Sequence, residues 1–161
     1  MQITLAHIGA RRNIGTKVRS GSKAGTDPAE AWIQSYLERT SAYARCQSEV
    51  FPSVASFREW SVKQQGRTPL CSVLLDSRGK MLSSEAFAEW LGTRRDNGIQ
   101  HLVLAIGPAD GWSEEDRKQA TLLLSFGPMT LAHTLARLVA AEQIYRAFTI
   151  LAGHPYHGGH Q

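Results

Sequence analysis

The apolar positions along the chain follow two different periods in turn. Short β-branched or leucine-rich runs at 3–9, 46–51, 69–76, 101–107 and 121–126 predict five strands. Between these runs, apolar residues recur at helical spacing. They predict helices from the capping sequence Asp27-Pro28-Ala29-Glu30 to about Ala44, from Ser83 to 94–98, from Ser113 onward, and from about Thr134 to Ala152. Residues 52–69 are ambiguous, with a short helix at FREW and a turn at QQGRTP, and SRGK at 77–80 predicts another turn.

Strands that alternate with helices are typical of an α/β fold with a mostly parallel sheet. No repeat, linker or low-complexity segment divides the chain, so we expect one domain over residues 1–161. Ligands of such sheets bind beyond the carboxyl ends of the strands. Three strand ends meet that description: Leu75-Asp76, Ile106-Gly107-Pro108 and Phe126-Gly127-Pro128.

The last predicted helix is apolar around most of its circumference. A helix of this kind must be covered on most sides, which one sheet face cannot do. We therefore expect a second subunit to pack against it, although a central core helix would give the same pattern. The residues concerned are Leu135, Leu138, Val139, Ile144, Tyr145, Phe148 and Ile150.

Composition places the chain among ordinary globular proteins, with 42% hydrophobic and 20% charged residues. No apolar run approaches the ~20 residues that span a bilayer. The first basic residues follow an apolar stretch instead of preceding it, which is the wrong order for a secretory signal. Cys46 and Cys71 share no motif spacing, so we expect a cytoplasmic protein with inert thiols.

Positive charge is concentrated near the start of the chain. No acidic residue occurs before Asp27, and the stretch RRNIGTKVRSGSKAG is also rich in Gly and Ser. A loop of this kind is either a clamp for the phosphate backbone of RNA or a solvated surface loop. The candidate phosphate contacts are Arg11, Arg12, Lys17, Arg19 and Lys23.

Several familiar motifs are absent from the chain. It has no GxGxxG after a strand, no Walker A loop, no GxSxG, no HExxH and no CxxC, which argues against a Rossmann dinucleotide site, a P-loop and a structural zinc site. Near its end stands GHPYHGGH, in which Pro155 and two adjacent glycines prevent the three histidines from sharing one helical face. We therefore expect no metal there.

The second half of the chain contains five motifs in a particular order. They are GKMLSSE at 79–85, VLAIGPADGW at 103–112, LSFGPMTLAH at 124–133, AAEQIYRAF at 140–148 and HPYH at 154–157. In this order and spacing they resemble the RlmH family of ribosomal RNA large-subunit pseudouridine-N3 methyltransferases, which belongs to the SPOUT class. The resemblance implies a C-terminal trefoil knot, S-adenosylmethionine as methyl donor, a homodimer formed through the last helix, and 23S rRNA in the assembled ribosome as substrate.

The resemblance also assigns roles to particular residues. It implies that the cofactor is held by Leu75, Gly107, Phe126, Gly127, Pro128, Met129, Thr130 and Leu131. The terminal segment would contact the target nucleoside, with His157 first, Tyr156 second and His154 third as catalytic candidates, since Tyr can stack on a base and His titrates near neutral pH. Arg137 and Arg146 are weaker candidates for substrate contacts, with Glu142 as their structural partner.

The chain departs from the family pattern at three places. Pro108 stands where a second glycine is usual, Thr134 stands where a proline usually begins the last helix and could serve as its cap, and Gly158 replaces a basic residue, for which His160 could partly substitute. Pro108 and Gly158 favour one alternative, a non-catalytic RNA-binding relative. A SPOUT methyltransferase for another RNA nucleoside is a second alternative, and an α/β enzyme for a small molecule would leave the basic loop unexplained.

Overall fold

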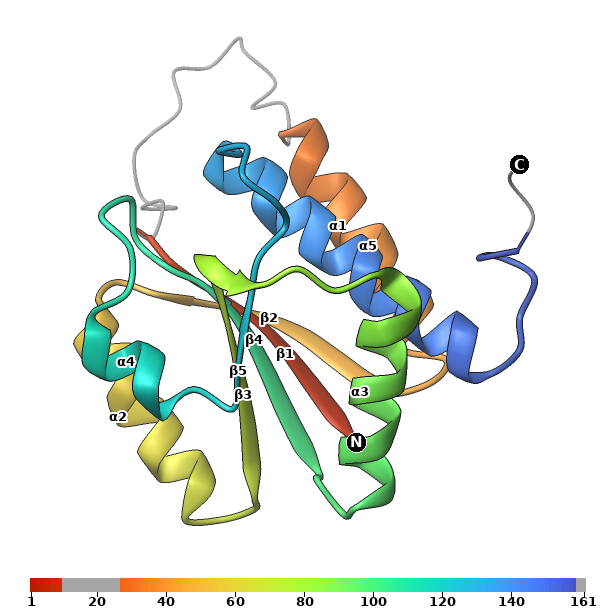
Figure 1. Cartoon of the computed structure of the whole chain (residues 1–161), viewed down its shortest axis with the longest axis horizontal. Coiled ribbons are helices and arrows are strands. Elements are labelled where there is room, and N and C mark those ends of the chain that lie inside the picture. The colour runs from red at the N-terminus through yellow and green to blue at the C-terminus, as the bar shows by residue number, and fades with distance from the viewer. Residues whose placement is uncertain (10–26, 159–161) are drawn as a thin grey trace, which may run out of the picture.

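The computed structural model describes residues 1–9 and 27–158 and contains a five-stranded sheet with helices on both faces (Figure 1). The strands are β1 (Gln2–Ile8), β2 (Arg45–Phe51), β3 (Leu70–Lys80), β4 (His101–Ile106) and β5 (Leu122–Leu124). The helices are α1 (Pro28–Thr40), α2 (Val54–Gln65), α3 (Ser84–Asp96), α4 (Glu114–Gln119) and α5 (His133–Leu151). The strand order is β2-β1-β4-β3-β5 and every neighbouring pair is parallel, which confirms the predicted α/β fold with a parallel sheet.

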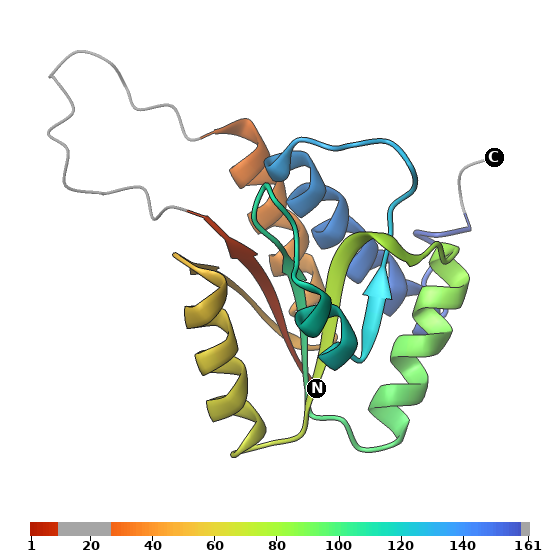
Figure 2. The same ribbon diagram turned by 60° about the vertical axis from the view of Figure 1, so that its left-hand side comes forward.

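Two helical layers cover the sheet, with α1, α3 and α5 on one face and α2 and α4 on the other (Figure 2). Strand β4 shows why both layers are needed, because all six of its residues are buried. Leu102, Leu104 and Ile106 belong to the core under α1, α3 and α5, whereas Val103 and Ala105 belong to the core with Phe57 of α2. This alternation is the period of two that a strand buried on both faces imposes.

Polar caps fix where the helices begin, as the sequence predicted. Asp27 accepts a hydrogen bond from the Ala29 N–H at 3.0 Å, and Pro28 occupies the first helical position. Ser83 and Ser113 cap α3 and α4 in the same way. Glu30 does not complete the cap of α1, because its carboxylate accepts hydrogen bonds from Arg137 of α5.

Two predictions for the stretch between β2 and α3 were wrong. The SRGK segment is not a turn, since β3 continues through it to Lys80, and Leu124 of β5 pairs with both Leu75 and Lys80 across an irregularity in the register. Likewise, residues 54–65 form a helix of 12 residues, not a short one. Ser53 and Ser56 cap this helix reciprocally, a signal within the ambiguous stretch that identifies the helix start.

Helix α5 packs against α1, α3 and the central strands, so its own chain covers much of its apolar surface. Leu135 remains 50% exposed, and Trp32 of α1 remains 56% exposed. The predicted cap at Thr134 was wrong, because Ala132 is the N-cap and no side chain hydrogen-bonds to the start of the helix. No helix within the described ranges is long and apolar enough to cross a membrane.

Candidate functional site

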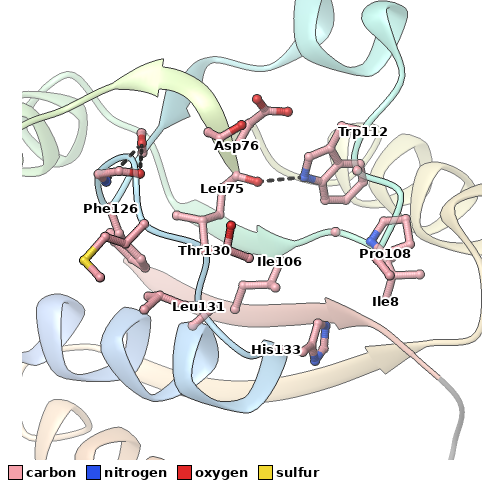
Figure 3. Close-up of a pocket in the computed structure, with 18 of the residues that line it drawn as sticks. Ile8, Leu75, Asp76, Ile106, Pro108, Trp112, Phe126, Thr130, Leu131 and His133 are labelled. Atoms are coloured by element: carbon pink, nitrogen blue, oxygen red, sulfur yellow. Dashed lines mark hydrogen bonds between the residues drawn. The ribbon is translucent and has the colours of Figure 1, made fainter.

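An open cavity of about 670 Å³ lies at the carboxyl ends of β1, β4 and β5 and beside the middle of β3 (Figure 3). Leu75 and Asp76 lie where the pairing of β3 with β4 ends, and the segment that follows β4 begins with Gly107. The loop that joins β5 to α5 closes one side, while Ile8 and Gly9 of β1 reach the rim. Most of the lining is apolar, and the volume suits a ligand of nucleoside size.

The structure brings together all eight residues that the resemblance implied for the cofactor. Each of them lines this cavity, although they come from three separate segments of the chain. Figure 3 shows the side chains of Leu75, Phe126, Thr130 and Leu131 together in this region. Parallel strands explain the convergence, because their carboxyl ends meet at one edge of the sheet.

Trp112 joins two of these segments and was missed by sequence reasoning. Its indole Nε1–H donates to the Leu75 carbonyl at 3.1 Å (Figure 3), and its ring is 4% exposed. A Cβ atom at position 107 would lie 2.8 Å from the indole, so only glycine allows the ring to approach so closely. Trp112 thus fixes the distance between the β3 and β4 ends of the cavity, and its aromatic type within GPADGW was the available signal.

The loop after β5 presents backbone donors beside the cavity. Gly127 has φ of +115° and its N–H donates to Ser125 Oγ at 3.1 Å, a local turn that favours glycine. The N–H groups of Met129, Thr130 and Leu131 donate to no other residue among those described. They are therefore available to the polar edge of a ligand.

One histidine lines a wall of the cavity, and a second histidine and a buried cation lie behind that wall. The rings of His7 on β1 and His133 on α5 meet edge to face at 5.4 Å between centroids. Burial, together with the positive charge of Arg137, lowers the pKa of His7 from 6.5 to about 4. The same causes lower the pKa of His133, which lines the cavity. Both rings are therefore neutral at pH 7, and Arg137 is paired with Glu30, so it contributes no free charge to the cavity.

The terminal segment leaves α5 through a defined helix stop. Gly153 has φ of +69°, its N–H donates to the Ile150 carbonyl, and the His154 N–H donates to the Thr149 carbonyl. This pair of hydrogen bonds is a Schellman motif, in which glycine supplies the left-handed residue. The segment then turns back along the helix. Within it the Tyr156 N–H donates to His154 Nδ1 at 3.2 Å, and Tyr156 and His157 reach side chains of α5.

Tyr156 and His157 pack against side chains of α5 and α3. The Tyr156 hydroxyl donates to Glu142 Oε1 at 3.1 Å, and its ring lies under the Arg146 guanidinium at 4.8 Å. Burial raises the pKa of Tyr156 above its ordinary range, as does hydrogen bonding to its neighbours, so the phenol stays protonated. Arg146 is held in turn by Glu142 at 2.7 Å, as predicted. The same prediction for Arg137 was wrong, because Arg137 pairs with Glu30.

The predicted catalytic residues do not line the cavity of their own chain. His154, Tyr156 and His157 follow the end of α5 opposite to His133, which does line the cavity. The predicted basic contacts Arg11, Arg12, Lys17, Arg19 and Lys23, and also His160, lie outside the described residues. Within residues 1–9 and 27–158, no group of three or more His, Cys, Asp or Glu side chains is placed to hold a metal ion.

Comparison with known proteins shows which sequences this chain is similar to. The family described as predicted SPOUT methyltransferase matches residues 16–157. Ribosomal RNA large subunit methyltransferase H of Koribacter versatilis is 50% identical over 125 residues, which cover 78% of this chain and 85% of that protein. The protein of the same name from Methylocella silvestris is 43% identical over 151 residues, covering 84% of this chain and 92% of the relative.

A solved structure is similar to this chain in fold. A probable methylase family protein from Haemophilus influenzae superposes with a TM-score of 0.53 at 11% sequence identity. The match covers 96% of this chain and 69% of that structure. At this identity the likeness concerns the arrangement of the elements alone.

Proposed function

Because the chain belongs to the SPOUT methyltransferases and, within them, to the family of ribosomal RNA large subunit methyltransferase H, we propose that it methylates N3 of a pseudouridine in 23S rRNA. The methyl donor would be S-adenosylmethionine, the whole chain would act as one methyltransferase domain, and the substrate would be the assembled ribosome in the cytoplasm. The observation that carries the proposal is the single cavity that gathers all eight expected cofactor residues.

The cavity fits S-adenosylmethionine in size and chemistry. Its apolar lining would accommodate the adenine ring, and the free N–H groups of Met129, Thr130 and Leu131 would donate to polar atoms of the cofactor. When bound, the cofactor supplies an electrophilic methyl group on its sulfonium. The surrounding residues would hold that methyl in line with the target nitrogen, and such positioning supplies much of the rate enhancement when little covalent machinery is needed.

A homodimer would bring the terminal segment of one chain to the cavity of the other. Supporting this, α1 and α5 expose apolar side chains around a groove of about 450 Å³, which includes Trp32, Leu138 and Val139. Tyr156 and His157 follow the same helix and do not line the cavity of their own chain. The partner's segment would then contact the target nucleoside through Tyr156 and His157.

RNA would be held by the basic loop at 11–23. Ile8 and Gly9, which directly precede this loop, line the rim of the cavity. Cationic side chains that follow this rim in the sequence would neutralise phosphates near the target nucleotide. One small domain offers little surface for reading a sequence, so the shape of the ribosome would supply most of the specificity.

We propose in addition that the chain carries the trefoil knot of the SPOUT class. The support comes from contacts between β3 and β5. Leu124 pairs with β3 at two positions, Leu75 and Lys80, and a Cβ at Gly79 would lie 2.6 Å from the Leu123 carbonyl carbon. The backbone around Gly79 and Lys80 is thus in close contact with the backbone of Leu123 and Leu124, which supports a tight passage of one segment past the other.

The proposal is tested with the purified full-length chain. Isothermal titration with S-adenosylmethionine should show saturable binding, and incubation with large subunits that lack the modification should transfer labelled methyl groups to 23S rRNA. Absence of binding at millimolar cofactor would refute the enzyme. Binding without transfer would favour the non-catalytic RNA-binding relative instead.

A further inference from the structure

The imidazole of His157 lies between two charged side chains from different helices. Its Nδ1 atom is 3.1 Å from Nη1 of Arg146 on α5. Its Nε2 atom is 2.6 Å from Oε1 of Glu85 in the first turn of α3. Both ring nitrogens are therefore occupied by contacts within the chain, and the two partners differ in what they can donate.

The arginine decides which nitrogen of His157 carries the proton. A guanidinium has only N–H donors and keeps its charge at all relevant pH values. Nδ1 must then accept, so the ring proton is on Nε2 and is donated to the Glu85 carboxylate. Protonating Nδ1 as well would set its N–H against the N–H of Arg146.

Each partner of His157 is itself held in place. Glu142 accepts two hydrogen bonds from Arg146, at 2.9 and 2.7 Å, and a third from the Tyr156 hydroxyl. Hydrogen bonds to its own backbone N–H and to His157 lower the pKa of Glu85 below its ordinary value of 4.5, which keeps it ionised at neutral pH. The charged and titratable groups around the ring are thus Arg146, Glu85, Glu142 and Tyr156.

From these contacts we infer that Glu85 is a positioning residue for the terminal segment. Together with Arg146 it fixes His157 as a neutral ring with its proton on Nε2. While both contacts hold, neither nitrogen has a lone pair free for the N3 proton of the substrate. On the proposed function, on which this step rests, the role of His157 in this arrangement is to hold Tyr156 and the segment in place, and another group accepts the proton.

Nitrogen-15 NMR of the histidine rings in the full-length chain tests the arrangement without any substrate. At pH 7, wild-type His157, assigned with a His157→Gln variant, should show an unprotonated Nδ1 and a protonated Nε2. Glu85→Ala should give the averaged signals of exchanging tautomers. Glu85→Gln should keep the wild-type pattern, because its amide oxygen still accepts from Nε2. A protonated Nδ1 in the wild type, or unchanged His157 signals in Glu85→Ala, would overturn the inference.

Kinetics then separates positioning from general stability. Glu85 does not line the cavity, so Glu85→Ala should leave cofactor affinity unchanged while kcat falls roughly tenfold or more, as expected when a reacting group is misplaced. Glu85→Gln should restore kcat. Glu89→Gln, an exposed change one turn along α3, is the matched control and should behave as wild type.

An unchanged kcat in Glu85→Ala, or a loss that Glu85→Gln does not restore, contradicts a positioning role. If the wild type transfers no methyl group at all, the proposed function has failed. The NMR result still decides the state of His157 in that case.

Discussion

Gly79 has no room for a side chain. A Cβ atom there would lie 2.6–2.7 Å from the backbone of Leu123 and Leu124, and backbone atoms cannot rotate away as a flexible side chain can. We predict that Gly79→Ala lowers the free energy of unfolding by about 1–3 kcal/mol, the usual cost of overpacking. Urea denaturation of the purified variant measures this loss.

Gly66 provides the control for that substitution. It ends α2 with φ of −70°, and a Cβ there would make only ordinary contacts, the nearest at 3.5 Å. Gly66→Ala should therefore leave stability unchanged or raise it by about 0.4–1 kcal/mol, because alanine restricts the unfolded chain. Equal effects at the two positions would contradict the close backbone contact between β3 and β5.

The side chain of Trp112 donates one hydrogen bond that helps to shape the cavity. Trp112→Phe keeps an aromatic ring but removes the N–H that donates to the Leu75 carbonyl. Losing one such bond costs about 0.5–1.5 kcal/mol, so we expect the affinity for S-adenosylmethionine to fall by up to about tenfold. Isothermal titration measures this change. Trp60→Phe, in the same aromatic cluster but outside the cavity lining, should bind as the wild type does.

At the scale of elements, β1 and α5 meet through two histidines that remain neutral. The pKa of His7 in the folded chain is about 4, against 6.5 for an ordinary histidine, because burial and Arg137 disfavour its charged form. Between pH 6.5 and 4 the unfolded chain therefore binds a proton at this site that the folded chain does not. The free energy of unfolding must then fall as the pH is lowered through this window.

Substituting His7 isolates its contribution to the pH dependence of stability. His7→Gln should reduce the slope of stability against pH between pH 6.5 and 4, as followed by urea denaturation. Val62→Gln changes an exposed side chain on α2 without adding or removing a titratable group, and should leave the slope as it is. A wild-type slope in His7→Gln would show that His7 does not resist protonation in the folded chain.

The limits of sequence reasoning also appear at the scale of elements. Caps at Asp27, Ser83 and Ser113 predicted three helix starts, because capping is local chemistry between residues at most three apart. The SRGK segment has the composition of a turn, yet pairing with β5, more than 40 residues later, keeps it extended. The single-face periodicity of α5 was lost because α1, α3 and the sheet all pack against it.

In the candidate site, too, features marked by local sequence were predictable and features that depend on long-range contacts were not. Strand ends marked by Gly107 and Gly127 located the cavity, since parallel strands end at one edge. The part played by Trp112 could not be predicted, because its partner Leu75 is 37 residues away in sequence. The partners of His157 were hidden for the same reason, as Glu85 is 72 residues distant.

For the whole molecule, the exposed apolar surface of α1 and α5 is where the proposed homodimer can be tested. Leu135 is 50% exposed and lies outside the cavity lining. If a second copy covers it, Leu135→Glu should weaken dimerisation by about 3 kcal/mol or more, because a leucine is lost and a charge must be buried. Sedimentation equilibrium measures the association.

Val62 offers a matched control on α2, across the sheet from α5. It is 72% exposed, so Val62→Glu should not change the molecular mass in solution. A wild-type chain that sediments as a monomer would exclude the homodimer. A Leu135→Glu variant that dimerises as tightly as the wild type would place the interface elsewhere.

The central claim concerns one methyl group in the ribosome. Mass spectrometry of 23S rRNA from a strain that lacks this chain tests that claim directly. We expect N3-methylpseudouridine to disappear in that strain and to return when the wild-type gene is restored. An undiminished N3-methylpseudouridine signal in the deletion strain would contradict the proposed substrate.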